Sequence, residues 1–175
     1  MKIKSLFKEF LSSKGFTLIE LLIVIAILGV LAAGVLVAID PVEQLNRARD
    51  VSRKSSVSQL GRALQAYYTA NSAYPNVAGW NTTLTTSGEI KVFPTNPGAP
   101  LAPVCTAGVV VSNFCYKTSP TPDIIVYTHM ESKTEMNKGT CLGVAANTWY
   151  VYSSADGKSG LLCGAEPLVG VIGLL

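Results

Sequence analysis

A long apolar run lies near the start of the chain. The nineteen residues from Leu21 to Ile39 include no charged and no amide side chain. A helix of this length spans roughly 29 Å, which is close to the hydrocarbon thickness of a bilayer. The pattern therefore predicts a hydrophobic transmembrane helix over residues 16–40, preceded by a short polar leader over residues 1–15 and followed by an exported domain.

A second helical pattern follows Pro41. Apolar residues recur there at the three- and four-residue spacing of one helix face, which predicts an amphipathic helix over residues 41–71. Proline removes a backbone donor and clashes with the preceding turn, so Pro41 predicts a break between the two helices. Gly29 and Gly34 are expected to break or loosen the apolar helix further. The apolar stripe consists of Val57, Leu60, Leu64 and Tyr67.

The rest of the chain reads as a loop followed by short strands. Residues 72–104 are rich in Thr, Asn, Gly and Pro, which predicts a mostly irregular loop with one short helical turn. Residues 105–175 contain four strand signals separated by turn residues. The expected fold class is α+β, with a long N-terminal helix packed on an antiparallel sheet of about four strands. Alternation within one strand directs four residues toward the helix, namely Ile124, Val126, Thr128 and Met130.

The formal net charge of +3 resides in the leader. Residues 1–15 carry four lysines and one glutamate, and the ten other basic residues balance the ten other acids. Positive residues beside a transmembrane helix stay in the cytoplasm. The chain is therefore expected to cross a membrane once, with a cytoplasmic N-terminus.

Four cysteines, all beyond the apolar run, predict two disulfide bonds in the exported domain. Three pairings are open, and Cys105–Cys115 with Cys141–Cys163 is favoured because each bond closes a local loop. The sequence has no Cys-x-x-Cys pair and His129 is its only histidine, so a zinc site is not expected. No metal and no cofactor are predicted.

A group of basic residues on the second helix allows two interpretations. The group could bind DNA, or it could form a solvated helix face whose charges pair with Glu43 and Asp50. Interleaved acids weaken the attraction to phosphate, so the second interpretation is favoured. No catalytic constellation stands out, so neither enzymatic activity nor a small-molecule substrate is expected. The basic group comprises Arg47, Arg49, Arg53, Lys54 and Arg62.

The junction between the leader and the apolar run resembles the signature of type IV prepilins and of the pseudopilins of type II secretion. That signature is a short basic leader ending in Gly, then an aromatic residue, Thr-Leu-x-Glu and a long apolar run. Residues 14–20, Lys-Gly-Phe-Thr-Leu-Ile-Glu, match it at every position. The resemblance implies the pilin fold for the α+β arrangement.

The resemblance also implies a route of processing and assembly. A prepilin peptidase would cut between Gly15 and Phe16 and methylate the new amine of Phe16. A pilus assembly platform with its ATPase would then draw the chain from the inner membrane into an extracellular filament of identical copies. Glu20 would face the Phe16 amine of a neighbouring copy and set the register between subunits.

The favoured function is a pilin that polymerises into a type IV pilus-like surface filament. A type II secretion pseudopilin is the first alternative, and a helix-anchored exported binding domain that does not polymerise is the second. Residues 154–160 resemble a segment that precedes a calcium site in major pseudopilins, but Glu166 is the only acid that follows them here. The Cys141–Cys163 bond is expected to secure this region instead, which favours the pilus.

Two segments keep open interpretations. Residues 81–83, Asn-Thr-Thr, form a glycosylation sequon, although an unmodified polar loop is preferred. The apolar residues 168–175 are too short to span a bilayer. They are expected either to add an edge strand or to contact a neighbouring subunit.

Overall fold

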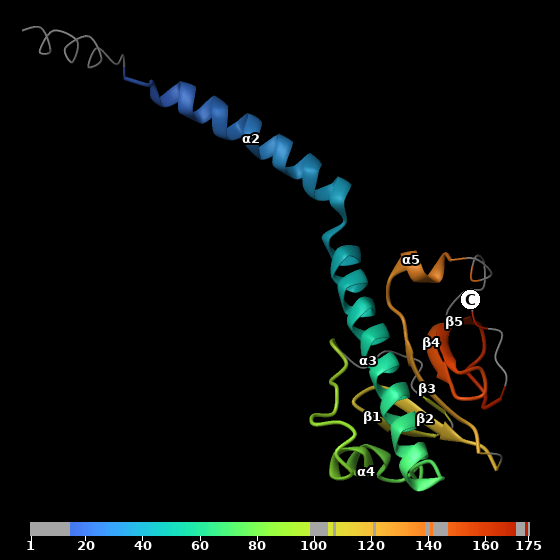
Figure 1. The fold of residues 1–175 in the computed structure, drawn as a ribbon. Coiled ribbons are helices and arrows are strands. Elements are labelled where there is room, and N and C mark those ends of the chain that lie inside the picture. Colours follow the sequence, from blue (N-terminus) through green and yellow to red (C-terminus); the bar gives the residue numbers. More distant parts are fainter. Residues whose placement is uncertain are drawn as a thin grey trace, which may run out of the picture. The chain divides into compact units, whose positions relative to one another are not determined.

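The computed structural model describes residues 15–98, 105–106, 108–120, 122–138, 141, 147–170 and 174. The chain divides into two compact units, Met1–Pro41 and Val42–Leu175. Figure 1 shows the helices and strands in chain order. The expected leader, residues 1–15, lies outside the described residues except for Gly15.

The first unit contains the apolar helix α2 (Leu18–Ile39), whose residues are all exposed. Its 22 residues correspond to about 33 Å of helix, enough to cross a bilayer. Among the described residues, the helical stretch Leu18–Asn71 is the one candidate for a membrane span.

The interruption between the helices lies at Asp40, which has left-handed backbone angles (φ 45°, ψ 76°). The helix α3 (Pro41–Asn71) begins directly after it. The expected breaks at Gly29 and Gly34 are wrong, since α2 runs through both positions. Glycine costs about 1 kcal/mol in a helix but keeps its amide donor. Pro41 lacks that donor and also disfavours helical angles at the preceding residue.

The second unit contains a five-stranded antiparallel sheet with strands in chain order. The sequence predicts about four strands, and the sheet has one more because the first strand signal contains both strands of a hairpin. Ser112 and Asn113 both have positive φ (49° and 64°), the geometry of a two-residue type I′ turn. The strands are β1 (Val109–Val111), β2 (Phe114–Thr118), β3 (Ile124–His129), β4 (Thr148–Ser153) and β5 (Lys158–Cys163).

One face of the sheet packs against α3. The apolar stripe of α3 contributes Val57, Leu60 and Leu64 to this core, and β3 contributes Ile124 and Val126, as the alternation predicts. The short helix α4 (Trp80–Thr86), which lies in the 72–104 loop, adds Trp80 and Leu84.

At Gly61, α3 lies directly against a side chain of the sheet. A Cβ atom at Gly61 would lie 2.5 Å from the ring of Tyr152, which is far below any ordinary contact distance. The ring of Tyr152 therefore occupies the space that a side chain at Gly61 would need.

The second face of the sheet carries its own apolar cluster. The C-terminal residues Val169 and Leu174 pack against this cluster, and the described residues of the C-terminal segment add no strand to the sheet. The disulfide Cys105–Cys115 lies at the same face, and Cys141–Cys163 joins the segment after the short helix α5 (Lys133–Met136) to β5. The cluster consists of Cys115, Ile125, Tyr127, Trp149 and Val151.

Candidate assembly site

Thr17 and Glu20 form a capping box at the start of α2. Thr17 has extended backbone angles (φ −77°, ψ 149°), and its hydroxyl oxygen accepts a hydrogen bond from the Glu20 amide at 3.3 Å. In return, Glu20 Oε2 accepts from the Thr17 amide at 2.9 Å and from its hydroxyl at 2.7 Å. The carboxylate is thus satisfied within its own chain, at the positive end of the helix.

The capping box gives a physical role to the Thr-Leu-x-Glu part of the motif. Thr17 was not among the expected site residues, although a Thr three residues before Glu at the start of an apolar run is itself a helix-start signal. Gly15 and Phe16 precede the helix, and the Phe16 side chain is exposed. Among the described residues, and apart from the neighbours of Gly15 in the chain, no atom lies within 4 Å of a Cβ built on Gly15.

The basic residues of α3 form the expected solvated face only in part. Arg47 is half-exposed and pairs with Glu43 at 3.2 Å, as expected. Arg53 has no exposed surface, and its Nη1 lies 2.8 Å from Asp50 and 3.1 Å from Glu131. Lys54 pairs with Glu135 at 2.7 Å rather than with Asp50. The four-residue spacing of Asp50 and Lys54 predicts a pair between these two side chains. This prediction is wrong, because Asp50 lies on the buried side of α3. Salt bridges engage four of the five bases of the group, which further lowers the prospect of DNA binding.

Two carboxylates of α3 hold the segment that contains the short helix α5 (Lys133–Met136). Asp50 accepts hydrogen bonds from the amides of Glu131 and Ser132. Glu43 accepts from the amides of Lys133 and Thr134, at the positive end of α5. Burial works to raise the pKa of Glu43, but these amide bonds and Arg47 outweigh it and lower the pKa.

Arg53 also holds the end of the 72–104 loop. Its Nε donates to Asn96 Oδ1 at 2.6 Å, and its Nη2 donates to the carbonyl of Pro97 at 2.8 Å. The amide nitrogen of Asn96 continues the network to Thr128 Oγ1 at 2.9 Å. One buried guanidinium therefore ties together α3, the loop and the segment after β3.

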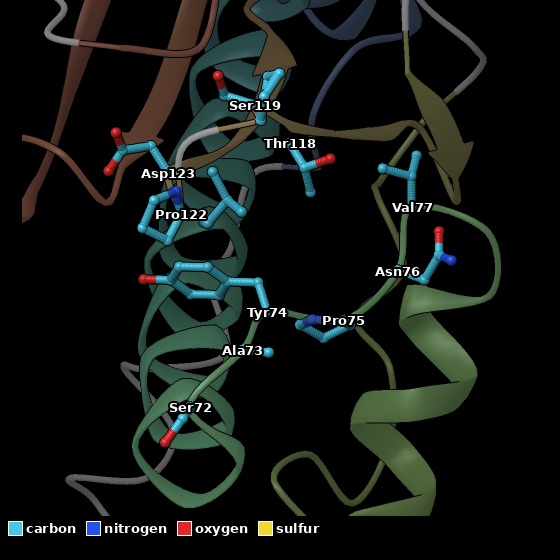
Figure 2. Close-up of a pocket in the computed structure, with 12 residues that line it drawn as sticks. Ser72, Ala73, Tyr74, Pro75, Asn76, Val77, Thr118, Ser119, Pro122 and Asp123 are labelled. Carbon is cyan, nitrogen blue, oxygen red and sulfur yellow. The ribbon is translucent and has the colours of Figure 1, made fainter.

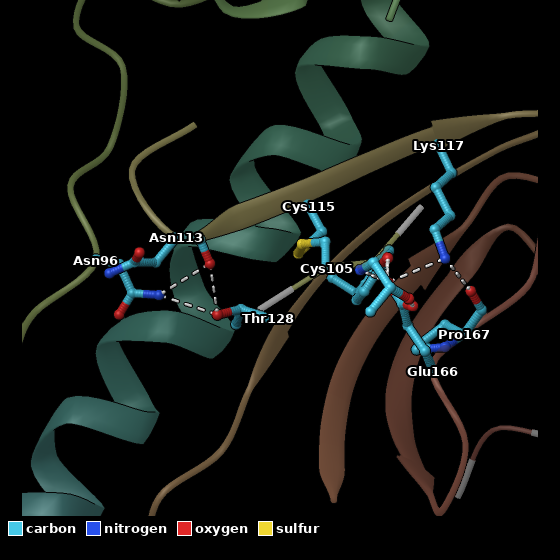
Figure 3. Close-up of a disulfide and its surroundings, with 10 residues drawn as sticks. Asn96, Cys105, Asn113, Cys115, Lys117, Thr128, Glu166 and Pro167 are labelled. Atoms are coloured by element: carbon cyan, nitrogen blue, oxygen red, sulfur yellow. Dashed lines mark hydrogen bonds and ion pairs between the residues drawn. A yellow bond between two sulfur atoms is a disulfide. The ribbon is translucent and has the colours of Figure 1, made fainter. Parts of the chain in front are cut away.

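Glu166 lies in a polar cluster on the second face of the sheet (Figure 3). Its carboxylate is 3.1 Å from Lys117 Nζ and accepts hydrogen bonds from the Tyr127 and Thr106 hydroxyls. Lys117 Nζ also donates to the carbonyl of Pro167 at 3.1 Å. Glu166 thus serves as an ion-pair partner, and the described residues contain no group of three His, Cys, Asp or Glu that could hold a metal ion.

We expect this cluster to make the protein sensitive to acid. Burial works to raise the pKa of Glu166, but hydrogen bonds from Thr106 and Tyr127 and the charge of Lys117 outweigh it and lower the pKa from 4.5 to about 2. A depressed folded-state pKa stabilises the fold above the unfolded value, and this stabilisation is lost as pH falls from 4.5 toward 2.

Chemical unfolding monitored between pH 7 and pH 2 checks this expectation. Glu166→Gln should be less stable than the wild type at neutral pH and should lose less stability on acidification. Glu89→Gln, at the turn after α4, serves as the control. A wild type and a Glu166→Gln variant with the same dependence on pH would contradict the prediction.

The remaining candidate residues belong to the second unit. His129 lies at the end of β3, with its ring edge-on to Trp149 at 5.1 Å between centroids. Asp156 and Gly157 form the turn between β4 and β5, as the sequence predicts. Asn81, in the sequon, lies in α4.

Comparison with known families gives one match. Residues 11–36 match the model of the prokaryotic N-terminal methylation motif, which covers Gly15, Phe16, Thr17, Glu20 and most of α2. No curated protein and no solved structure matches the chain significantly. Proteins with this motif are structural pilin-type subunits rather than enzymes. Over residues 11–36 the chain is therefore similar to type IV pilins and pseudopilins, and its long helix and antiparallel sheet form a pilin-like α+β arrangement.

Proposed function

We propose that this protein is a pilin that polymerises into a type IV pilus-like surface filament after leader removal. A prepilin peptidase cuts between Gly15 and Phe16 and methylates the new amine. Before assembly the chain is held in the inner membrane by α2, with its N-terminus cytoplasmic. The assembly platform and its ATPase then move it into the extracellular filament.

The observation that carries the proposal is the position of Glu20. Its carboxylate is held in the first turn of α2, four residues after Phe16, within an otherwise apolar and exposed helix. Burying an isolated carboxylate in hydrocarbon costs several kcal/mol. The presence of Glu20 in a membrane helix therefore indicates a function. Cleavage creates a cation at Phe16, and a neighbouring copy supplies that cation to Glu20.

The exposed apolar surface of α2 supports polymerisation for a separate reason. The large apolar side chains of α2 are all solvent-accessible in the single chain. Such a surface needs either lipid or other apolar helices around it. Lipid covers it in the membrane, and the helices of other copies cover it in the filament.

Substitutions at Gly15 and Glu20 test processing and assembly separately. Gly15→Leu should leave the leader uncut, because the larger side chain blocks the access of the peptidase to the backbone at residue 15. Glu20→Gln keeps a capping oxygen but removes the charge, so the protein should be cut and methylated while filament yield falls by about tenfold or more. Thr17→Ser keeps the cap and should behave as wild type.

Mass spectrometry of the membrane fraction reports cleavage and methylation, and electron microscopy of sheared surface material reports filaments. Normal filaments from Glu20→Gln would rule out the role proposed for the charge. A processed wild-type chain that forms no surface filament, with a secretion defect on deletion, would indicate a pseudopilus. A chain that never leaves the membrane would indicate an anchored binding domain.

A further inference from the structure

Buried charge distinguishes two polar regions of the second unit. The first is an open hollow of about 450 Å³ between the residues that follow α3 and the β2–β3 connection (Figure 2). Asp123 is the one charged side chain among its described lining residues, and it is only half-buried. The second region is the cluster around Glu166, where Lys117 is 7% exposed. A charge buried this deeply needs fixed partners, so the second region constrains the segments that meet there.

Glu166 belongs to a C-terminal strap, defined here as residues 164–170, which lies on the second face of the sheet. All seven residues of the strap are described, and none of them belongs to a strand. Side chains of β4 hold both of its ends. Trp149 Nε1 donates to the carbonyl of Gly164 at 3.3 Å, and Ser153 Oγ donates to the carbonyl of Gly170 at 3.3 Å.

The Glu166 carboxylate holds the middle of the strap. It accepts hydrogen bonds from the Tyr127 hydroxyl and from both the amide and the hydroxyl of Thr106, and it lies 3.1 Å from Lys117 Nζ. Lys117 Nζ also donates to the carbonyl of Pro167 at 3.1 Å. The donors therefore come from β2, from β3 and from the segment before β1. Because Thr106 supplies two of them, the position of Thr106 affects how firmly the strap is held.

The disulfide Cys105–Cys115 fixes the position of Thr106 (Figure 3). Thr106 follows Cys105 directly and is itself exposed, so packing does little to hold it. In the β1–β2 ladder, the residue opposite Cys115 is Val110 and not Cys105. The covalent bond, rather than the ladder, therefore brings Cys105 to Cys115, with 6.0 Å between their Cα atoms, and Thr106 to Glu166.

We propose that the Cys105–Cys115 disulfide is a redox-sensitive switch that controls the strap. With the bond intact, Thr106 donates to Glu166 and the strap covers Trp149, which is 1% exposed. Without the bond, Glu166 loses both donors of Thr106, and the strap opens more often. Opening exposes the apolar cluster of the second face. The switch does not rest on polymerisation, because all of its residues belong to the second unit of a single chain.

The reductant of this switch is a dithiol. Its thiolate attacks one sulfur of the disulfide and forms a mixed disulfide, which the second thiolate of the reductant then resolves. The S–S bond of the protein breaks, and the two cysteines take up two electrons and two protons as the dithiol becomes a disulfide. An oxidising compartment such as the one outside the cytoplasm keeps the bond formed and the strap closed.

Acylation of lysine amines in the full-length chain in detergent micelles, followed by mass spectrometry, tests the proposal. Lys117 should react about tenfold faster in Cys105→Ala/Cys115→Ala than in the wild type, because its amine is free whenever the strap is open. Treatment of the wild type with dithiothreitol should produce the same increase. The exposed Lys91 provides the reference rate, and Lys54, which pairs with Glu135 on α5, reports on the rest of the second unit.

The matched control is Cys141→Ala/Cys163→Ala, which removes the other disulfide but no donor to Glu166. Lys117 should stay protected in this variant. If both double variants accelerate Lys117 equally, or if Lys54 accelerates together with Lys117, the bond stabilises the whole unit rather than the strap, and the proposal is wrong.

Thr106→Ala tests the connection between the bond and the strap while both disulfides stay intact. Loss of the Thr106 hydroxyl donor should accelerate Lys117 about threefold. In the Cys105→Ala/Cys115→Ala background the same substitution should add nothing, because Thr106 no longer reaches Glu166. An unchanged Lys117 rate in Thr106→Ala, or an equal effect in both backgrounds, would overturn the proposal.

Discussion

Arg53→Ala is expected to lower the free energy of unfolding of the second unit by about 3–5 kcal/mol. Arg53 is fully buried, and Asp50 beside it is 1% exposed. Removing the guanidinium leaves two carboxylates, those of Asp50 and Glu131, without their buried cation. It also removes the donors to Asn96 and to the carbonyl of Pro97. The loss includes the cost of leaving these buried acceptors without the Arg53 donors, in addition to the loss of the two ion pairs.

Denaturant unfolding of the full-length chain in micelles, followed by near-ultraviolet circular dichroism, measures this change. Arg47→Ala is the matched control because Arg47 forms the half-exposed pair with Glu43 on the same helix. Exposed pairs contribute at most about 1 kcal/mol, so this variant should remain close to wild type. Similar small losses in both variants would show that the buried network contributes little to stability.

Gly61→Val is expected to destabilise the second unit by about 3 kcal/mol, at the upper end of the cost of overpacking a core. A Cβ at Gly61 would lie 2.5 Å from Cγ and Cδ2 of Tyr152, which belong to a ring rather than to the end of a flexible chain. Tyr152 is itself buried between α3 and the sheet. Relief of the clash therefore requires movement of the helix or of the strand.

A double-mutant cycle with Tyr152→Leu separates this clash from a general effect of valine in a helix. The Leu side chain leaves space beside residue 61, so Gly61→Val should cost less in the Tyr152→Leu background. Gly29→Ala is the control for substituting a helical glycine, because no atom lies within 4 Å of a Cβ at Gly29. An equal cost of Gly61→Val in both backgrounds would rule out the Tyr152 clash as its cause.

The fold class could be predicted because it depends on local patterns. The apolar stripe Val57–Tyr67 and the alternation around Ile124 each indicate their element and the face that it buries. Pro41 likewise indicates the break, since its effect on the preceding residue is covalent. By contrast, the hairpin inside the first strand signal was missed, because Ser112 and Asn113 interrupt the apolar run without the glycine that usually occupies such a turn.

The polar interior was not predictable from sequence spacing. Asp50 and Lys54 have the separation of an exposed helix pair, so the pattern favours a solvated face. Asp50 is instead buried, because its partners are the amides of Glu131 and Ser132, more than eighty residues along the chain. Tertiary contacts of this kind leave no local signature. The cap at Thr17 differs, because the sequence does contain its signal.

The capping box also bears on the proposed removal of the leader. Both of its residues, Thr17 and Glu20, lie on the product side of the Gly15–Phe16 bond, so cleavage removes none of the hydrogen bonds that start α2. The Gly15–Phe16 bond precedes the first residue of α2, so cleavage there would require no unwinding of α2. Leader release and helix integrity are thereby uncoupled, and the mature subunit starts one residue before an intact N-cap.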